Sequence, residues 1–181
     1  ALENAAKTLL TRYLPAGFVT SMTYAGPTSP YSPGPAAFQS AALGRFNEGC
    51  LLWVYIGHGS RREVDRIRTP RGAYPILSVR AAALAPRPQP PLACFLSCYS
   101  GAFDGPEDCL AEEMLRADGG PIGVMCGSRV TMPYAMSILG QELMTSLFHD
   151  RRATLGDVLC RAKCSSVGKP RDDDESRRFD A

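Results

Sequence analysis

One apolar pentapeptide, together with the break that follows it, constrains the fold of this chain most. Residues 92–96 read Leu-Ala-Cys-Phe-Leu, which is typical of a strand buried on both faces. The pattern ends at Ser-Cys-Tyr-Ser-Gly, residues 97–101, so Cys98 falls just past the carboxyl end of the strand. Ligands bind at that edge of an open parallel sheet. The sequence therefore predicts that Cys98 lies at a ligand-binding edge.

A second strand of the same kind delivers a histidine. Residues 51–56 read Leu-Leu-Trp-Val-Tyr-Ile, and Gly-His-Gly-Ser follows at once. If the two strands are parallel and adjacent, His58 and Cys98 emerge at one edge, and a thiol beside an imidazole is suited to nucleophilic catalysis. Each residue alone has a plainer interpretation. A cysteine after a strand is usually a small buried hydrophobe, and a histidine between glycines often marks a tight turn.

Both motifs resemble those of a known peptidase family. Residues 47–60, which contain Asn-x-Gly, the apolar strand and Tyr-x-Gly-His-Gly-Ser, look like the histidine motif of the gingipain-type C25 cysteine peptidases. Residues 97–104 look like their cysteine motif. Three later stretches fit the family in order: residues 110–112, 123–130 and 154–163. The wider caspase-like group, including the CHAT peptidases, shares the His-Gly and Cys plan.

This resemblance implies a cysteine endopeptidase. Cys98 would supply the nucleophilic thiolate, and His58 would act as general acid and base. Such families stabilise the oxyanion with backbone amides at the positions of Gly59 and Cys98. In them the loop after the next strand helps to wall the substrate pocket, and that loop here contains Ser128 and Arg129. A protein or peptide is the implied substrate.

The sequence leaves a third catalytic group and the specificity open. Asp104 matches the family motif, but we expect it to cap the next helix or to fix the turn. Glu48 and Asp65 are alternative groups for orienting His58. Arg129 is either a determinant that favours an acidic P1 residue, the one before the cleaved bond, or a salt-bridged or solvent-facing side chain.

Alternating strand and helix patterns predict an α/β architecture, a three-layer caspase-like fold whose mostly parallel sheet has helices on both faces. Helical patterns occupy 2–13, 36–46 and 76–84, and further helices begin at Pro106, Pro133 and Thr154. Further strands are predicted at Phe18–Tyr24 and Ile122–Cys126. The sequence predicts a loop at residues 26–35, an Arg-rich loop at 61–71 and an extended connector at 85–91. The last residues, 168–181, are polar. The Arg-rich loop is either solvated or rims the active-site mouth.

Composition restricts the function further. The 181 residues, 45% of them hydrophobic, predict one domain spanning 1–181, and the absence of a starting Met suggests a segment of a longer protein. A net charge of +2 gives no reason to expect nucleic acid binding by this domain or attraction to an anionic membrane. No apolar run approaches the roughly 20 residues that span a bilayer.

Seven cysteines and two histidines shape the expectations about metals and compartment. No pair of cysteines has the C-x-x-C spacing of a zinc site, so neither a metal nor another cofactor is expected. Mostly reduced, buried thiols favour an intracellular location, although the resembled family is often secreted.

Two other enzyme classes are excluded by single features. A Cys-x5-Arg phosphatase needs arginine where this chain has Asp104, whose charge would repel phosphate. The glycine fingerprint of a dinucleotide-binding domain is absent. The remaining alternative is a caspase-like interaction module that is inactive or gated by an activating partner or by additional domains of the same chain. The presence of both His58 and Cys98 disfavours an inactive fold.

Overall fold

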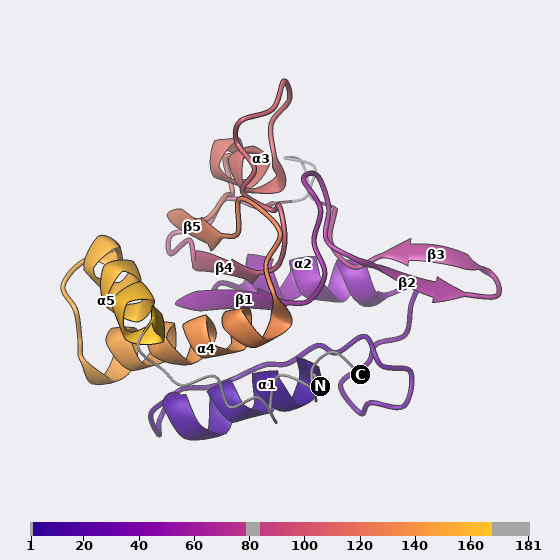
Figure 1. Ribbon diagram of the computed structural model, residues 1–181. Helices are drawn as coiled ribbons and strands as arrows, with labels where there is room; N and C mark the ends of the chain where they lie inside the picture. The colour runs from indigo at the N-terminus through magenta and orange to yellow at the C-terminus, as the bar shows by residue number, and fades with distance from the viewer. Residues whose placement is uncertain (1, 79–83, 168–181) are drawn as a thin grey trace. The chain divides into compact units, whose positions relative to one another are not determined.

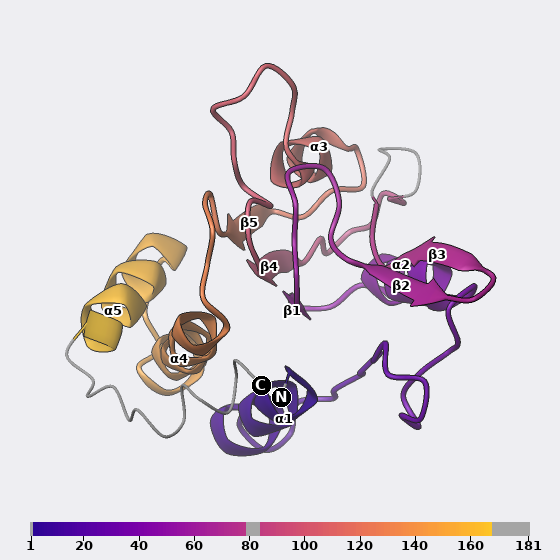
Figure 2. The same ribbon diagram turned by 45° about the vertical axis from the view of Figure 1, so that its right-hand side comes forward.

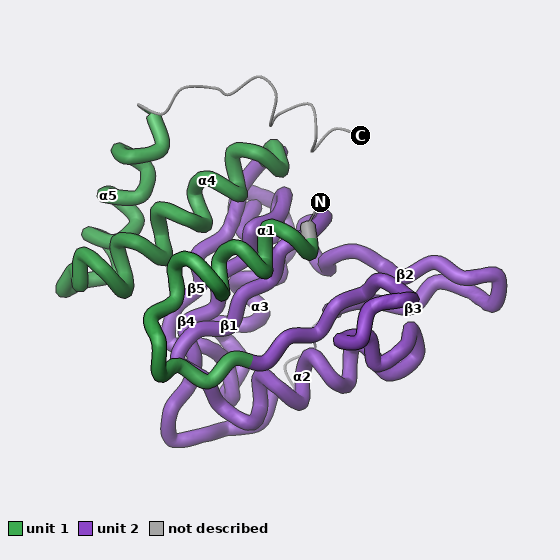
Figure 3. Tube along the Cα trace, turned by 90° about the horizontal axis from the view of Figure 1, so that it is seen from below, with its two compact units in different colours: residues 1–20, 131–181 green, residues 21–130 purple. Residues whose placement is uncertain are grey.

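The computed structural model describes residues 2–78 and 84–167, drawn as ribbons in Figure 1. These residues belong to two compact units, one made of residues 1–20 and 131–181 and the other of residues 21–130 (Figure 3). Most of the helix predicted at 76–84, and the polar end at 168–181, lie outside the described residues. The assignment of the whole chain to a single domain stays a prediction.

A parallel three-stranded sheet forms the centre of the 21–130 unit. Its strand order is β1 (Leu52–Ile56), β4 (Leu92–Leu96) and β5 (Gly123–Cys126) (Figure 1). β1 pairs with β4 from Leu52↔Leu92 to Ile56↔Leu96, and β4 pairs with β5 from Leu92↔Gly123 to Phe95↔Cys126. All five residues of β4 are buried, which explains why its sequence is uninterrupted by polar residues. The strands predicted at these three places are confirmed.

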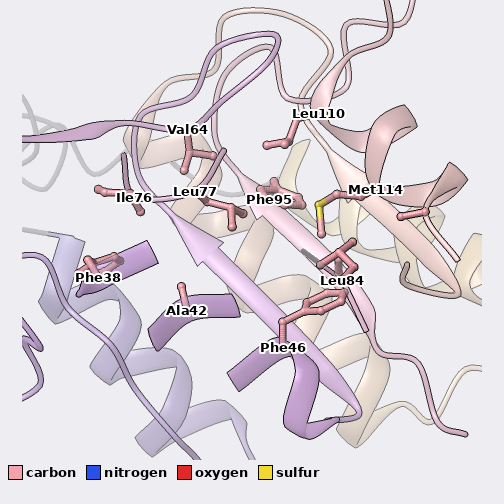
Figure 4. Close-up of a cluster of buried hydrophobic side chains, with 12 residues drawn as sticks. Phe38, Ala42, Phe46, Val64, Ile76, Leu77, Leu84, Phe95, Leu110 and Met114 are labelled. Carbon is pink, nitrogen blue, oxygen red and sulfur yellow. The ribbon is translucent and has the colours of Figure 1, made fainter. Parts of the chain in front are cut away.

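Helices α2 (Phe38–Glu48) and α3 (Leu110–Arg116) pack on one face of this sheet. Figure 4 shows Leu110 and Met114 of α3 beside Phe95 of the central strand, and Phe38, Ala42 and Phe46 along α2 in the same cluster. The Trp53 ring lies 5.6 Å from that of Phe95 and 5.9 Å from that of Phe46, centroid to centroid. Residues of β4 that point to the opposite face, such as Cys94, are also buried. Both faces of β4 therefore belong to the interior, as is typical of a central parallel strand.

The Arg-rich segment is only partly a loop. Residues predicted as loop include β2 (Arg66–Thr69), which pairs antiparallel with β3 (Gly72–Pro75) in a hairpin that projects from the sheet (Figures 1 and 2). The exposed arginines Arg66 and Arg68 alternate with half-buried neighbours. This alternation is the period of a strand with one solvated face. The high density of charged residues led to the prediction of a loop instead.

The strand predicted at Phe18–Tyr24 is wrong. That segment pairs with no strand among the described residues. Val19 is fully exposed, and the ring of Phe18 packs instead against that of Phe148, at 5.0 Å between centroids. Side chains that favour strands form one only where a sheet edge is available for pairing.

Helix α3 begins later than Pro106 predicts. Its first residue is Leu110, and Cys109 is the N-cap. The Cys109 N–H donates to the Glu112 carboxylate at 2.9 Å, which gives the reciprocal capping box that usually carries serine or threonine. Pro106 lies in the exposed loop before the cap, so proline was here a signal for the loop rather than for the first helical turn.

The second unit is helical. It contains α1 (Leu2–Thr8), the π-helical turn η1 (Leu9–Tyr13), α4 (Pro133–Met144), the π-helical turn η3 (Thr145–His149) and α5 (Leu155–Val167). The predicted helix start at Pro133 is confirmed, and the Asp157 N–H donates to Thr154 Oγ1 at 3.1 Å, which confirms the cap of α5. None of the helices among the described residues is long and apolar enough to cross a bilayer.

Candidate active site

The paired register of β1 and β4 determines where the predicted catalytic residues lie. The two strands stay paired through Ile56↔Leu96, and the Gly57 N–H still donates to the Leu96 carbonyl at 3.4 Å. His58 and Cys98 each follow two residues later on their own strands. The structure therefore brings the histidine loop and the cysteine loop together at the carboxyl edge of the sheet.

Gly59 is in direct contact with the cysteine loop. A Cβ atom at this position would lie 2.5 Å from the Cys98 carbonyl oxygen and 2.8 Å from Ser97 Oγ, which is closer than real Cβ atoms approach. Only glycine permits this close approach of the two loops. His58 is exposed and Cys98 is half-buried, so the paired loops remain open to solvent.

The backbone of His58 is fixed by two donors. The Tyr55 hydroxyl donates to the His58 carbonyl at 2.8 Å, and the Asp65 N–H donates to it at 3.2 Å. Burial raises the pKa of Tyr55, so its hydroxyl stays protonated and remains a donor. These bonds fix the position of the His58 backbone relative to the end of β1.

The antiparallel bridge between Gly59 and Val64 orients one further backbone group. Gly59 and Val64 do not bond to each other; the residues that flank them make the hydrogen bonds of the bridge. The Ser60 N–H donates to the Glu63 carbonyl at 2.8 Å, and the Asp65 N–H donates to the His58 carbonyl. In an antiparallel pair the residue between two such bonds directs its own N–H away from its partner. The Gly59 N–H is therefore directed away from residues 63–65.

The cysteine loop turns sharply immediately after Cys98. Tyr99 has a positive φ of 55°, which is uncommon for a residue with a side chain. Its N–H donates to the Arg129 carbonyl at 3.2 Å, and its carbonyl accepts the Ala102 N–H at 3.1 Å. Beneath the turn, the buried hydroxyls of Ser97 and Ser100 are 2.6 Å apart. This strained conformation is held by contacts on both sides, as is common at functional sites.

The loop after β5 joins the site as a third element. The Gly101 N–H donates to the Gly127 carbonyl at 3.0 Å, and Arg129 Nη1 donates to the Ser128 carbonyl at 2.7 Å. Arg129 Nη2 also bonds to Asp104 Oδ2 at 2.7 Å. The predicted pocket residues thus lie next to the cysteine loop.

Asp104 does not cap α3, which was one of its two expected roles. It lies six residues before the helix and is paired with Arg129, so the expectation that it fixes the turn describes it better. A hydrogen bond from its own backbone N–H, and then the bond from Arg129, lower the pKa of its carboxyl. Both side chains are exposed, and the pair is worth little as a stability term.

Of the two candidates for orienting His58, only Asp65 lies at the same end of the strand. Glu48 is the last residue of α2 and pairs with Arg45 at 3.1 Å, before β1 begins. The five residues of β1 then separate it from the histidine loop by about 17 Å at the usual rise of a strand. Asp65 contacts His58 through the backbone, and its carboxylate accepts the Arg66 N–H at 2.7 Å.

Most of the other cysteines are poor nucleophiles. Burial raises the pKa of Cys94 to about 12 and that of Cys126 to about 11, and it also raises those of Cys50 and Cys109. A thiol of this kind is protonated and inert at neutral pH. The exposed Cys160 and Cys164 lie on α5, in the helical unit. Cys126 also lies at the carboxyl edge of the sheet, as the last residue of β5, but Cys98 is the cysteine of the loop that contacts Gly59.

The close packing of Gly101 against Cys126 gives a test of how the cysteine loop is supported. A Cβ atom at residue 101 would overlap Cys126 Sγ, yet it would be 3.5 Å from Cys126 Cβ, an ordinary contact. We expect Gly101→Ala to lower the free energy of unfolding by about 1–3 kcal/mol through overpacking. The double variant Gly101→Ala/Cys126→Ala should recover most of that loss in urea denaturation. Equal stability of the single and double variants would mean that another contact limits the site.

Comparison with known proteins decides the family. The family model described as peptidase family C25 matches residues 2–179. The chain belongs to peptidase family C25. The predicted membership of the gingipain-type cysteine peptidases is therefore confirmed, and a search among curated proteins found no match.

Two solved structures resemble this C25 chain in fold. One is the crystal structure of the Arg-specific cysteine proteinase gingipain R (RgpB), with a TM-score of 0.62, and the other is the complex of the Porphyromonas gingivalis RgpB pro- and mature domains, with a TM-score of 0.60. Both are 22% identical over 98% of this chain. The chain spans 39% and 40% of their lengths, or about two fifths. The likeness confirms the predicted caspase-like α/β fold.

Among residues 2–78 and 84–167, no group of three or more His, Cys, Asp and Glu residues is arranged to hold a metal ion. The groups that the candidate site presents are the Cys98 thiol, the His58 imidazole and backbone amides.

Proposed function

We propose that this C25 chain carries the catalytic residues of a cysteine endopeptidase, with Cys98 as the nucleophile and His58 as the general acid and base. The observation that supports this most is the register of β1 and β4, which places both residues two positions past the Ile56↔Leu96 pair. The close approach of Gly59 to the Cys98 carbonyl also supports the proposal, because it leaves no room for a side chain between the two loops.

In this mechanism each step uses groups of the chain itself and water. The Cys98 thiolate attacks the carbonyl carbon of the scissile peptide bond and forms a tetrahedral intermediate. The His58 imidazolium gives its proton to the leaving amine as the C–N bond breaks, which leaves a thioester on Cys98. His58 then accepts a proton from water, whose oxygen attacks the thioester and releases the acid product and the thiol.

The proposed oxyanion donors are the N–H groups of Gly59 and Cys98. The Gly59 N–H is directed away from residues 63–65, since its neighbours make the bonds of the Val64 bridge. The Cys98 N–H lies at the start of the sharp turn at Tyr99. Two fixed backbone donors would stabilise the developing negative charge without reorganisation.

We further propose that Ser128 and Arg129 line the substrate pocket. The bond from Tyr99 N–H to Arg129 O ties this loop to the residue after the nucleophile. An acidic P1 side chain would meet the Arg129 guanidinium, although it would have to compete there with Asp104. A preference for acidic over neutral P1 residues is therefore expected to be modest.

The similar complex of pro- and mature domains motivates a proposal about partners. That complex joins two domains of RgpB, and it leads us to propose that a pro-domain or another segment of the same protein covers this site before activation. Such a segment would act at the exposed edge that contains His58. Protein or peptide substrates would occupy the same edge.

Covalent labelling tests the proposed nucleophile. Peptidyl acyloxymethyl ketones with acidic, basic or neutral P1 residues are incubated with the protein, and adducts are read by intact mass and peptide mapping. We expect one adduct, located at Cys98 and absent in Cys98→Ala. The matched control is Cys160→Ala, which removes an exposed thiol on α5 and should leave the adduct unchanged.

Other patterns of labelling would exclude parts of the proposal. Adducts on Cys160 or Cys164 that persist in Cys98→Ala would show that the probe reports exposure rather than catalysis. No adduct on a folded protein would favour a partner-gated module over an active peptidase. Faster labelling by basic than by acidic P1 probes would exclude the role proposed for Arg129.

A further inference from the structure

The first turn of α3 bonds to both catalytic loops. The Leu110 N–H donates to the Arg61 carbonyl at 2.7 Å, and the next N–H, that of Ala111, donates to the Ser100 carbonyl at 3.0 Å. The first N–H groups of a helix have no partner within the helix. Here two successive ones join the histidine loop and the cysteine loop to a common support.

The Arg61 side chain makes a second connection from the histidine loop. Its Nη2 atom donates to the Glu107 carbonyl, in the segment between the cysteine turn and α3. The guanidinium lies directly over Gly105, where a Cβ atom would overlap it. Arg61 thus reaches the same segment with its backbone carbonyl and with its guanidinium.

Part of this guanidinium is held away from water. Arg61 as a whole is half-buried, and its Nε atom is buried without a hydrogen-bond partner among the described residues. Burial of an unpaired donor costs free energy, so the remaining bonds of the side chain must hold it in place. The neighbouring Arg62 differs, because its pairs with Glu107 and Glu113 lie at the surface.

We propose that Arg61 is a positioning residue that holds the His58 loop in register with Cys98 by clamping it to residues 105–110. This proposal rests on the proposed function, since it concerns the alignment of that same pair. Arg61 is three residues from His58 and acts through the loop rather than through substrate. Loss of the clamp would let the imidazole shift relative to the thiol while substrate still binds beside Cys98.

The predicted consequence is a change in kcat rather than in KM. A misplacement of catalytic groups by about 1 Å costs about 10²-fold in rate. We expect Arg61→Gln to lower kcat by about that factor and to leave KM within threefold, measured on the full chain with the peptide that the labelling panel selects. Arg61→Lys keeps a charged donor for the Glu107 carbonyl, so its kcat should be at least about tenfold higher than that of Arg61→Gln.

Arg68→Gln is the matched control. It removes an equal charge from the exposed face of β2, in the same Arg-rich segment, and should change kcat by less than twofold. Equal thermal unfolding temperatures of the variants exclude a general loss of fold. If Arg61→Gln does not fold, the comparison of Arg61→Lys with wild type decides, because the lysine variant is expected to show a lower kcat at unchanged KM.

The outcomes separate this proposal from the proposed function. An unchanged kcat in Arg61→Gln, with Cys98→Ala inactive, would overturn the positioning role alone. A loss confined to KM would also overturn it and assign Arg61 to substrate binding. Turnover that persists in Cys98→Ala would refute the catalytic mechanism itself, whatever the Arg61 variants do.

Discussion

His58→Ala should lower kcat/KM for peptide cleavage by about 10²–10⁴-fold, the contribution of a positioned general acid and base. The side chain is exposed, so its removal leaves no cavity in the core. The loss should therefore appear in kinetics and not in stability. Steady-state assays with a fluorogenic peptide, beside urea denaturation of the same variant, measure the two effects separately.

The second histidine of the chain supplies the control for this variant. His149 is also exposed, and its Nε2 atom bonds to the Tyr13 carbonyl at 3.1 Å within the helical unit. We expect His149→Ala to retain at least half of the activity. Comparable losses in the two variants would argue against a catalytic imidazole at residue 58, and an unchanged rate in His58→Ala would remove it from the mechanism.

Gly59→Ala is expected to have the second largest effect. The new methyl group would meet the Cys98 carbonyl and the Ser97 side chain, both within 3 Å, so one of the two loops must move. This shift displaces both the imidazole of His58 and a proposed oxyanion donor. Loss of one such donor costs about 10²–10³ in kcat, and we expect at least that factor.

A glycine without such neighbours gives the matched control. Gly44 lies on the exposed side of α2, and a Cβ atom there would meet nothing within 4 Å. Gly44→Ala should leave kcat unchanged and raise the free energy of unfolding by about 0.5–1 kcal/mol, because alanine favours the helix. If Gly59→Ala retained full activity, the two loops would have to be less tightly coupled than the contact distances imply.

The central strands and their loops could be predicted because local and tertiary signals agree there. β1 and β4 are apolar runs, each followed at once by glycine or serine, and the two strands pair in parallel from Leu52↔Leu92 to Ile56↔Leu96. The hairpin that contains Arg66 could not be predicted from charge, and Pro106 gave a false start for α3. In the hairpin the charge of the arginines concealed the alternating pattern of a strand, and before α3 the proline concealed the capping box of Cys109 and Glu112.

The contacts between loops were beyond the reach of sequence patterns. Arg129 and Asp104 are 25 residues apart, and Arg61 and Glu107 are 46 apart. Such pairs follow from the order of strands in the sheet, which brings three loops to one edge. For the same reason the sequence left Glu48 and Asp65 as equal candidates, whereas the direction of β1 separates them.

The pairing of β1 with β4 also has a consequence for the timing of activity during synthesis. Each residue of β1 pairs with one that is forty positions later in the chain, for example Leu52 with Leu92. Synthesis proceeds at about 5–20 residues per second, so residues forty positions apart are added about 2–8 s apart. A chain emerging from the ribosome would therefore carry His58 before Cys98 is made, and under the proposed mechanism it could not cleave itself or its neighbours until β1 and β4 had paired.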